Sequence, residues 1–304
     1  MQRNNGGVML LLAAGLFGIT AQADEPALEA SVTVLNTDGK ESQVTELKFT
    51  TGTHRLAWLA NPDGKTEDDR KGPLALEVRE IQSTTYTKGV VTYVPISHIE
   101  SVKYDYDNKV INLSVKGLKG PLKGTLQYKG LNALNFSGKV DDKATTFSAG
   151  VIGKSTVKAV TFSGAKALPE AKKTGTTWAI QISQPAEKDP TLTVRNLKVL
   201  YHYSAGVEKL EDSIPVRKGA LLPLNGTVKR FEILATDPNT NIAAAEVDTA
   251  TSTERIVAIP LIQELDKKTG TLIGFIGEVD VGWKLFPLHT IKVITLTDVK
   301  KKVE

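Results

Sequence analysis

The chain has 304 residues, with 38 Lys and Arg against 34 Asp and Glu, and it contains no cysteine. This near balance of charge provides no basic footprint for nucleic acid. The lack of cysteine excludes disulfides, thiol catalysis and cysteine-ligated zinc. At roughly 100–200 residues per domain, the length predicts two domains, each able to bury its own core, and one large β-domain is the alternative.

The N-terminus has the order of a secretory signal peptide. A short polar segment with Arg3 precedes the apolar run Val8–Ile19, and the small residues Ala21 and Ala23 stand three positions and one position before Asp24. The apolar run of about 12 residues is shorter than the roughly 20 that span a bilayer, which disfavours a retained anchor. We therefore expect residues 1–23 to be a signal peptide, a mature chain from Asp24 without a membrane span, and a secreted or periplasmic, bacterial location.

Alternation of apolar and polar residues dominates the remaining chain and predicts half-buried strands. Turn signals such as Asp38-Gly39 and Asn225-Gly226 separate these runs, as hairpins require. The segment Glu254–Leu265 has a helical length, but Pro260 in its interior favours an extended conformation. The clearest alternating sets are Val32/Val34, Leu74/Leu76/Val78, Ile111/Leu113/Val115, Leu126/Tyr128, Trp178/Ile180/Ile182, Leu197/Val199/Tyr201/Tyr203 and Val279/Val281. The predicted fold class is all-β.

A short apolar pattern recurs along the chain, with apolar or aromatic residues at positions 1, 4 and 6. Pro95 and Pro287 each stand shortly before one copy, at a position where a strand tolerates proline. Two interpretations stay open: a strand–corner–strand unit duplicated between the halves, or chance in a β-rich chain. The copies are Val44-Leu47-Phe49, Ile99-Val102-Tyr104, Val157-Val160-Phe162, Val194-Leu197-Val199 and Ile291-Ile294-Leu296.

One segment lacks strand alternation and divides the chain. Residues 164–175 carry three Lys and one Pro between two alternating regions, a composition typical of a linker. We expect two tandem antiparallel β-sandwich or barrel-like domains, at residues 24–163 and 176–304. At the level of architecture this resembles the tandem immunoglobulin-like sandwiches of exported proteins, without their cysteine pair.

Two sets of residues are weak candidates for binding. Asp105, Asp107 and Asn108 offer three oxygen ligands in four residues, which suits calcium; a simple hairpin turn is the alternative. Exposed aromatic rings stack on sugars and anchor protein partners, whereas buried rings only pack a core. The candidates for such a ligand-binding surface are Tyr104, Tyr106, Tyr201 and Tyr203.

No catalytic set is apparent in the sequence. The four histidines, at positions 54, 98, 202 and 289, lack metal-ligand spacing, and no serine has the flanking glycines of a nucleophile elbow. We therefore expect no cofactor and a non-catalytic exported module that binds a cell-envelope polysaccharide or another exported protein. A secreted polysaccharide hydrolase and a carrier of an apolar ligand are the alternatives.

Overall fold

The computed structural model describes residues 31–79, 89–126, 132–169, 175–182, 191–203, 207–217, 220–224, 227–237, 242–249, 252–260, 262–265 and 268–297. The all-β prediction is confirmed: strands dominate these residues, joined by the short helix α1 (Glu67–Lys71) and three single 3-10 turns. Among the described residues, no helix has the length and apolar character needed to cross a membrane. The predicted signal peptide and the mature start at Asp24 lie outside the described residues.

The first sheet has eight antiparallel strands that enclose one apolar core. Val44, Leu47 and Phe136 are among its fully buried side chains, and the alternation that predicted the strands supplies most of the others. The spatial order is β10 (Lys143–Ala149), β9 (Leu134–Val140), β2 (Glu41–Thr51), β1 (Val32–Asn36), β11 (Val157–Phe162), β6 (Ile99–Asp105), β7 (Val110–Val115) and β8 (Leu122–Thr125).

The second sheet has an eleven-strand path with two side branches, and Trp178, Phe231 and Phe275 lie in its main core. The path runs through β19 (Thr253–Pro260), β18 (Ile242–Thr249), β17 (Val228–Asp237), β23 (Ile291–Thr297), β12 (Thr177–Ile182), β13 (Thr191–Tyr203), β21 (Lys268–Val279), β22 (Gly282–Pro287), β5 (Val91–Pro95), β4 (Leu74–Arg79) and β3 (Thr53–Arg55). The branches are β14 (Val207–Glu211) on β13 and β20 (Ile262–Leu265) on β21, while β15 (Ser213–Arg217) and β16 (Ala220–Pro223) form a separate pair. The described residues of the segment predicted as extended, 254–260 and 262–265, lie in β19 and β20.

Eight strands of the second sheet repeat the topology of the first. The correspondence holds in both spatial order and chain order. The spatial order in the first sheet is β10-β9-β2-β1-β11-β6-β7-β8, and the matching order in the second is β22-β21-β13-β12-β23-β17-β18-β19. The registers agree as well, since Val32 faces Val44 in the first hairpin and Trp178 faces Val194 in the second. The ladders also skip at the same place, between residues 45 and 48 of β2 and between residues 195 and 198 of β13.

The repeat extends to single residues. The sequence Phe-x-Gly-x-Val-Asp, with a second Phe eleven positions after the first, occurs from residue 136 and again from residue 275. Its two glycines occupy equivalent sites. A Cβ added to Gly138 would lie 2.4 Å from a methyl of Val44, and a Cβ added to Gly277 would lie 2.6 Å from a methyl of Val194. A shared topology, register and glycine contact together favour duplication over chance as the origin of the recurrent pattern.

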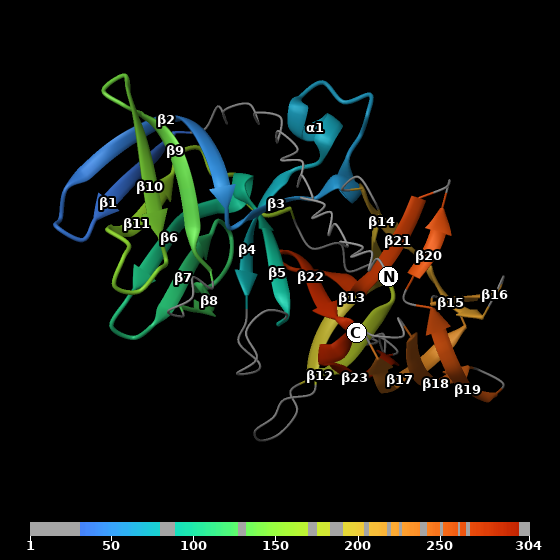
Figure 1. Cartoon of the computed structure of the whole chain (residues 1–304). Coiled ribbons are helices and arrows are strands. Elements are labelled where there is room, and N and C mark those ends of the chain that lie inside the picture. Colours follow the sequence, from blue (N-terminus) through green and yellow to red (C-terminus); the bar gives the residue numbers. More distant parts are fainter. Residues whose placement is uncertain are drawn as a thin grey trace, which may run out of the picture.

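Three strands from the first half of the chain belong to the second sheet. Strand β5 pairs with β22 through Tyr93 opposite Trp283, and β4 and β3 follow it outward. Figure 1 accordingly places β4 and β5 between the blue-green strands of the first sheet and the orange-red strands of the second. We call the seven buried residues at this junction the bridging core; they are Leu56, Ala75, Val91, Tyr93, Leu200, Ile276 and Leu285.

The described part of the predicted linker lies against the first sheet. The Lys166 amide donates to the Ser97 carbonyl, the Leu168 amide donates to the Lys116 carbonyl, and the Leu168 side chain packs on the first core. Residues 170–174 of the linker lie outside the described residues. The boundaries of the two predicted domains therefore stay predictions, and the contacts of β5 join strands from both sides of them.

Candidate functional site

The proposed calcium ligands form a hairpin turn between β6 and β7. The Asp105 carboxylate accepts hydrogen bonds from the Asn108 amide at 2.9 Å and from the Asn108 side chain at 2.8 Å. These hydrogen bonds lower the pKa of Asp105 from its ordinary value. Among the described residues, no three His, Asp or Glu side chains gather as metal ligands. Asp105 thus closes the turn, which is the alternative interpretation of this segment.

Three of the four candidate tyrosines are core residues. Tyr104, Tyr201 and Tyr203 are each at most 3 % exposed, so their rings present no face to a ligand. Burial raises the pKa of Tyr104 and of Tyr201 above the ordinary value. Tyr106 is half-buried, stacks on Tyr104, and donates a 2.6 Å hydrogen bond to the Val157 carbonyl. These contacts assign the four rings to packing.

The structure instead gathers charged side chains that no sequence spacing connects. His54 of β3 lies between Glu208 of β14 and Glu77 of β4, with Nε2 2.8 Å from one Glu208 oxygen and Nδ1 3.9 Å from a Glu77 oxygen. Arg79 contacts the other Glu77 oxygen at 2.9 Å, and His202 Nδ1 lies 3.7 Å from the other Glu208 oxygen. We call these five residues the His54 cluster.

Strand register explains how the cluster assembles. His54 faces Ala75 across the β3–β4 ladder, and Glu77 lies two residues further along the same face. In the second half of the chain, His202 and Glu208 face each other across the β13–β14 ladder. Because the bridging core packs these two faces together, charges from residues 54, 77 and 208 meet at its edge.

Electrostatics favour a charged imidazole at this place. Burial alone would lower the pKa of His54, but the hydrogen bond to Glu208 and the charges of Glu208 and Glu77 together raise it above the ordinary value. Burial and the same two carboxylates raise the pKa of Tyr93, which lies beside His54 with ring centres 5.0 Å apart. A proton on His54 therefore places a positive charge between two partly buried carboxylates.

Aromatic rings flank the His54 cluster on one side. Trp58, in the 3-10 turn after β3, lies 5.8 Å from His54, 6.0 Å from Tyr93 and 6.4 Å from Trp283 between ring centres. Trp58 and Trp283 are half-buried and pack on the bridging core. These rings limit the access of water to the ion pairs, which strengthens each of them.

The chemistry available to the His54 cluster is restricted by its pairing. A general base needs one ring nitrogen aimed at a substrate or a nucleophile. In this structure Nε2 of His54 faces Glu208 and Nδ1 faces Glu77, and Glu77 also contacts Arg79. The arrangement electrostatically joins strands β3 and β4 from the first half of the chain to strand β14 from the second half, within the second sheet. Two carboxylates on either side of an imidazole are its one resemblance to acid–base machinery.

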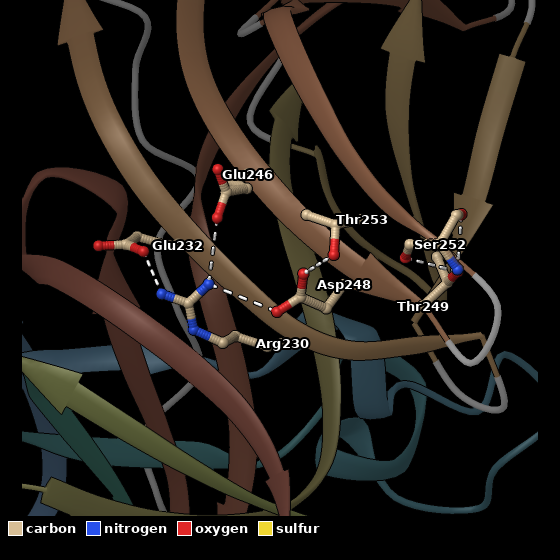
Figure 2. A network of polar contacts seen from close by, with 7 residues as sticks. All are labelled: Arg230, Glu232, Glu246, Asp248, Thr249, Ser252 and Thr253. Atoms are coloured by element: carbon tan, nitrogen blue, oxygen red, sulfur yellow. Dashed lines mark hydrogen bonds and ion pairs between the residues drawn. The ribbon is translucent and has the colours of Figure 1, made fainter.

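A second charge network lies on the far strands of the second sheet. Figure 2 shows Arg230 of β17 among three carboxylates: it contacts Glu232 directly, and its Nη1 lies 3.5 Å from both Glu246 and Asp248 of β18. Burial is the largest single effect and lowers the pKa of Arg230, but its contacts with Glu232 and Asp248 together raise the pKa above the ordinary value. Across the β17–β18 ladder Arg230 faces Asp248, a stabilising pair of opposite charges, whereas Glu232 faces Glu246. Arg230 contacts both of these glutamates and offsets their repulsion.

Sequence reasoning missed the His54 cluster because its members alternate along ordinary strands, at positions far apart in the chain. Their one common signal is a charged residue on the same strand face as apolar ones, as in Ala75 and Glu77. Comparisons of the chain with protein-family models, with curated proteins and with solved structures found no match.

Proposed function

We propose that the protein is exported and acts without catalysis, as a binding, adhesive or structural module on a cell-envelope polysaccharide or another exported protein. The observation that carries this proposal is the mutual pairing of His54, Glu77 and Glu208, the acid–base groups that the fold brings together. Groups held in such pairs hold strands in place rather than reacting with a substrate. The rigid, extended sheet that they join suits a scaffold.

A polysaccharide hydrolase is the second candidate, because carboxylates from separate strands meet at the His54 cluster. Glu77 and Glu208 would then be its acid and base. An apolar carrier receives no such support, since its interior would have to be empty, and buried side chains such as Leu47 and Phe136 fill the first core.

Export is tested by expressing the full chain in a bacterium with a secretory pathway. We expect the protein in the periplasm or the medium, with Asp24 as its N-terminal residue by Edman sequencing. A cytoplasmic protein that retains residues 1–23 would contradict the exported role.

The module and the hydrolase are separated by co-sedimentation with insoluble cell-envelope polysaccharide, combined with an assay for reducing ends. The module predicts sedimentation or an exported protein partner without bond cleavage, and equal binding by wild type and Glu208→Gln. Release of reducing ends by the wild type that falls by about a hundredfold or more in Glu208→Gln would establish the hydrolase instead.

A further inference from the structure

The repeat makes one strand edge of the first sheet an expected docking site. Strand β22 uses one edge for β21 and the other for β5, which lies antiparallel to it at residues 283–285. Its counterpart β10 pairs with β9 along its whole length, in the matching register. Within the described part of the chain, β10 pairs with no other strand. One copy of the fold thus carries an added strand at a position that is open in the other copy.

The other sheet ends are poor templates for strand addition. Natural proteins protect edge strands by shortness, charge and proline. Strand β3 has three residues, β8 has four with Lys123 and Gly124, and the β19 sequence contains Glu254, Arg255 and Pro260. Strand β10 has seven residues without proline and only one charge, at Lys143. It is the least protected of the four ends of the two large sheets.

The face of β10 that points to solvent carries small side chains, which suit extension of the sheet. Ala144, Thr146 and Ser148 alternate there and are exposed, while Phe147 and Ala149 point into the core. In β22 the residue equivalent to Thr146 is Leu285, which is 5 % exposed in the bridging core beside β5. Thr146 therefore occupies the place at which this fold accepts a neighbouring strand.

We propose that β10 pairs antiparallel with β10 of a second copy of this chain, which joins two first sheets across a twofold axis. The charges at its two ends complement each other in this arrangement. The exposed Asp141 and Asp142 precede β10, and the exposed Lys154 lies in the turn that follows it. Antiparallel pairing brings the acidic end of one strand to the basic end of the other and keeps the two Lys143 residues apart. The dimer goes beyond the proposed function and does not depend on export.

The test uses the cysteine-free background of the full mature protein. Thr146 is the middle residue of β10, so Thr146→Cys places two thiols near the twofold axis, where oxidation links them. Thr161→Cys is the matched control, because Thr161 is an exposed threonine on β11, a strand paired on both sides. We expect a disulfide-linked dimer of Thr146→Cys at least about tenfold faster than of Thr161→Cys.

Light scattering across a concentration series gives an independent measurement. The wild type should dimerise, and Thr146→Lys should weaken the dimer by about tenfold or more, since like charges meet across the axis. Thr161→Lys should leave it unchanged. A wild type that stays monomeric at millimolar concentration, or equal cross-linking of both cysteine variants, would overturn the dimer and leave the proposed function untouched. Binding of polysaccharide by a protein that stays monomeric would likewise overturn the dimer and leave the proposed function untouched.

Discussion

At the scale of single residues, His54 is the position where burial and charge act against each other most directly. Its ring is three-quarters removed from solvent, and two carboxylates nevertheless keep it attracted to a proton. Because the pKa of His54 is raised, the folded protein holds this proton more tightly than the unfolded chain. The stabilisation is complete below the ordinary pKa of histidine and is lost as the pH rises through the raised value.

His54→Gln should consequently lower the stability of the protein more in acid than in base. We expect a loss of about 1–3 kcal/mol in the free energy of unfolding at pH 5.5, where a hydrogen-bonded charge pair is removed, and a smaller loss at pH 9. Urea unfolding at a series of pH values measures the difference. His202→Gln is the control, since His202 is half exposed and lies 3.7 Å from the same Glu208. Equal losses at both pH values would refute the charged state of His54.

At the scale of elements, the most informative features are the two bent strands β2 and β13. Each contains one residue with a left-handed backbone at the point where the ladder skips: Glu46 with φ 51° and Asn196 with φ 49°. Asparagine adopts this conformation readily, whereas glutamate pays a steric cost of about 1 kcal/mol. The first copy of the fold therefore stores strain that the second copy avoids.

Glu46→Asn should relieve this strain and raise the free energy of unfolding by about 0.5–1 kcal/mol. The substitution also removes the 2.8 Å contact of Glu46 with Lys139, but that pair is exposed and contributes little. Chemical denaturation measures the gain, and Lys139→Gln isolates the effect of the lost ion pair. A destabilised Glu46→Asn beside an unchanged Lys139→Gln would show that the backbone at residue 46 is not strained.

The sequence was sufficient to predict where the strands lie but not which strands pair with one another. Alternation located strands such as β4, β7 and β12 because one face of each packs on a core, and Pro260 identified an extended segment of helical length. The duplication was visible only as a loose apolar pattern, although the Phe-x-Gly-x-Val-Asp repeat at residues 136 and 275 is a stronger signal in the same sequence. Nothing local marks β5 as a strand of the second sheet, because its partner lies at residues 283–285.

The candidate site residues lie in a turn and on core-facing strands for a related reason. Asp105 and Asn108 are adjacent in sequence because a turn needs them, and the paired tyrosines share a strand face because that face is the core. By contrast, the His54 cluster depends on how β3 and β4 meet β13 and β14. Residue spacing along one strand carries no information about which strands pack together in the fold.

At the scale of the whole molecule, the bridging core determines whether the two sheets unfold together. It contains Leu56 and Tyr93 from the first half of the chain, and Leu200 and Leu285 from the second. Burial of these side chains couples the two larger cores, so the wild type should unfold in a single calorimetric transition.

Leu200→Ala should weaken this coupling. A buried leucine replaced by alanine costs about 2–5 kcal/mol, and here the loss falls on the junction. We expect calorimetry to resolve two transitions for Leu200→Ala, and one lowered transition for the control Leu113→Ala, whose side chain lies in the first core. A single transition for Leu200→Ala, with equal calorimetric and van't Hoff enthalpies, would mean that the junction does not control cooperativity.

The pairing of β5 with β22 also sets an order of events during synthesis. The ribosome releases residue 93 long before residue 283, so the growing chain carries β4 and β5 with one bare edge until the last strands emerge. Closing so long a loop is slow, and bare edges recruit other chains in the meantime. A chain shortened before β22 should therefore depend on chaperones that shield extended segments, while the complete chain shields β5 with its own final strands.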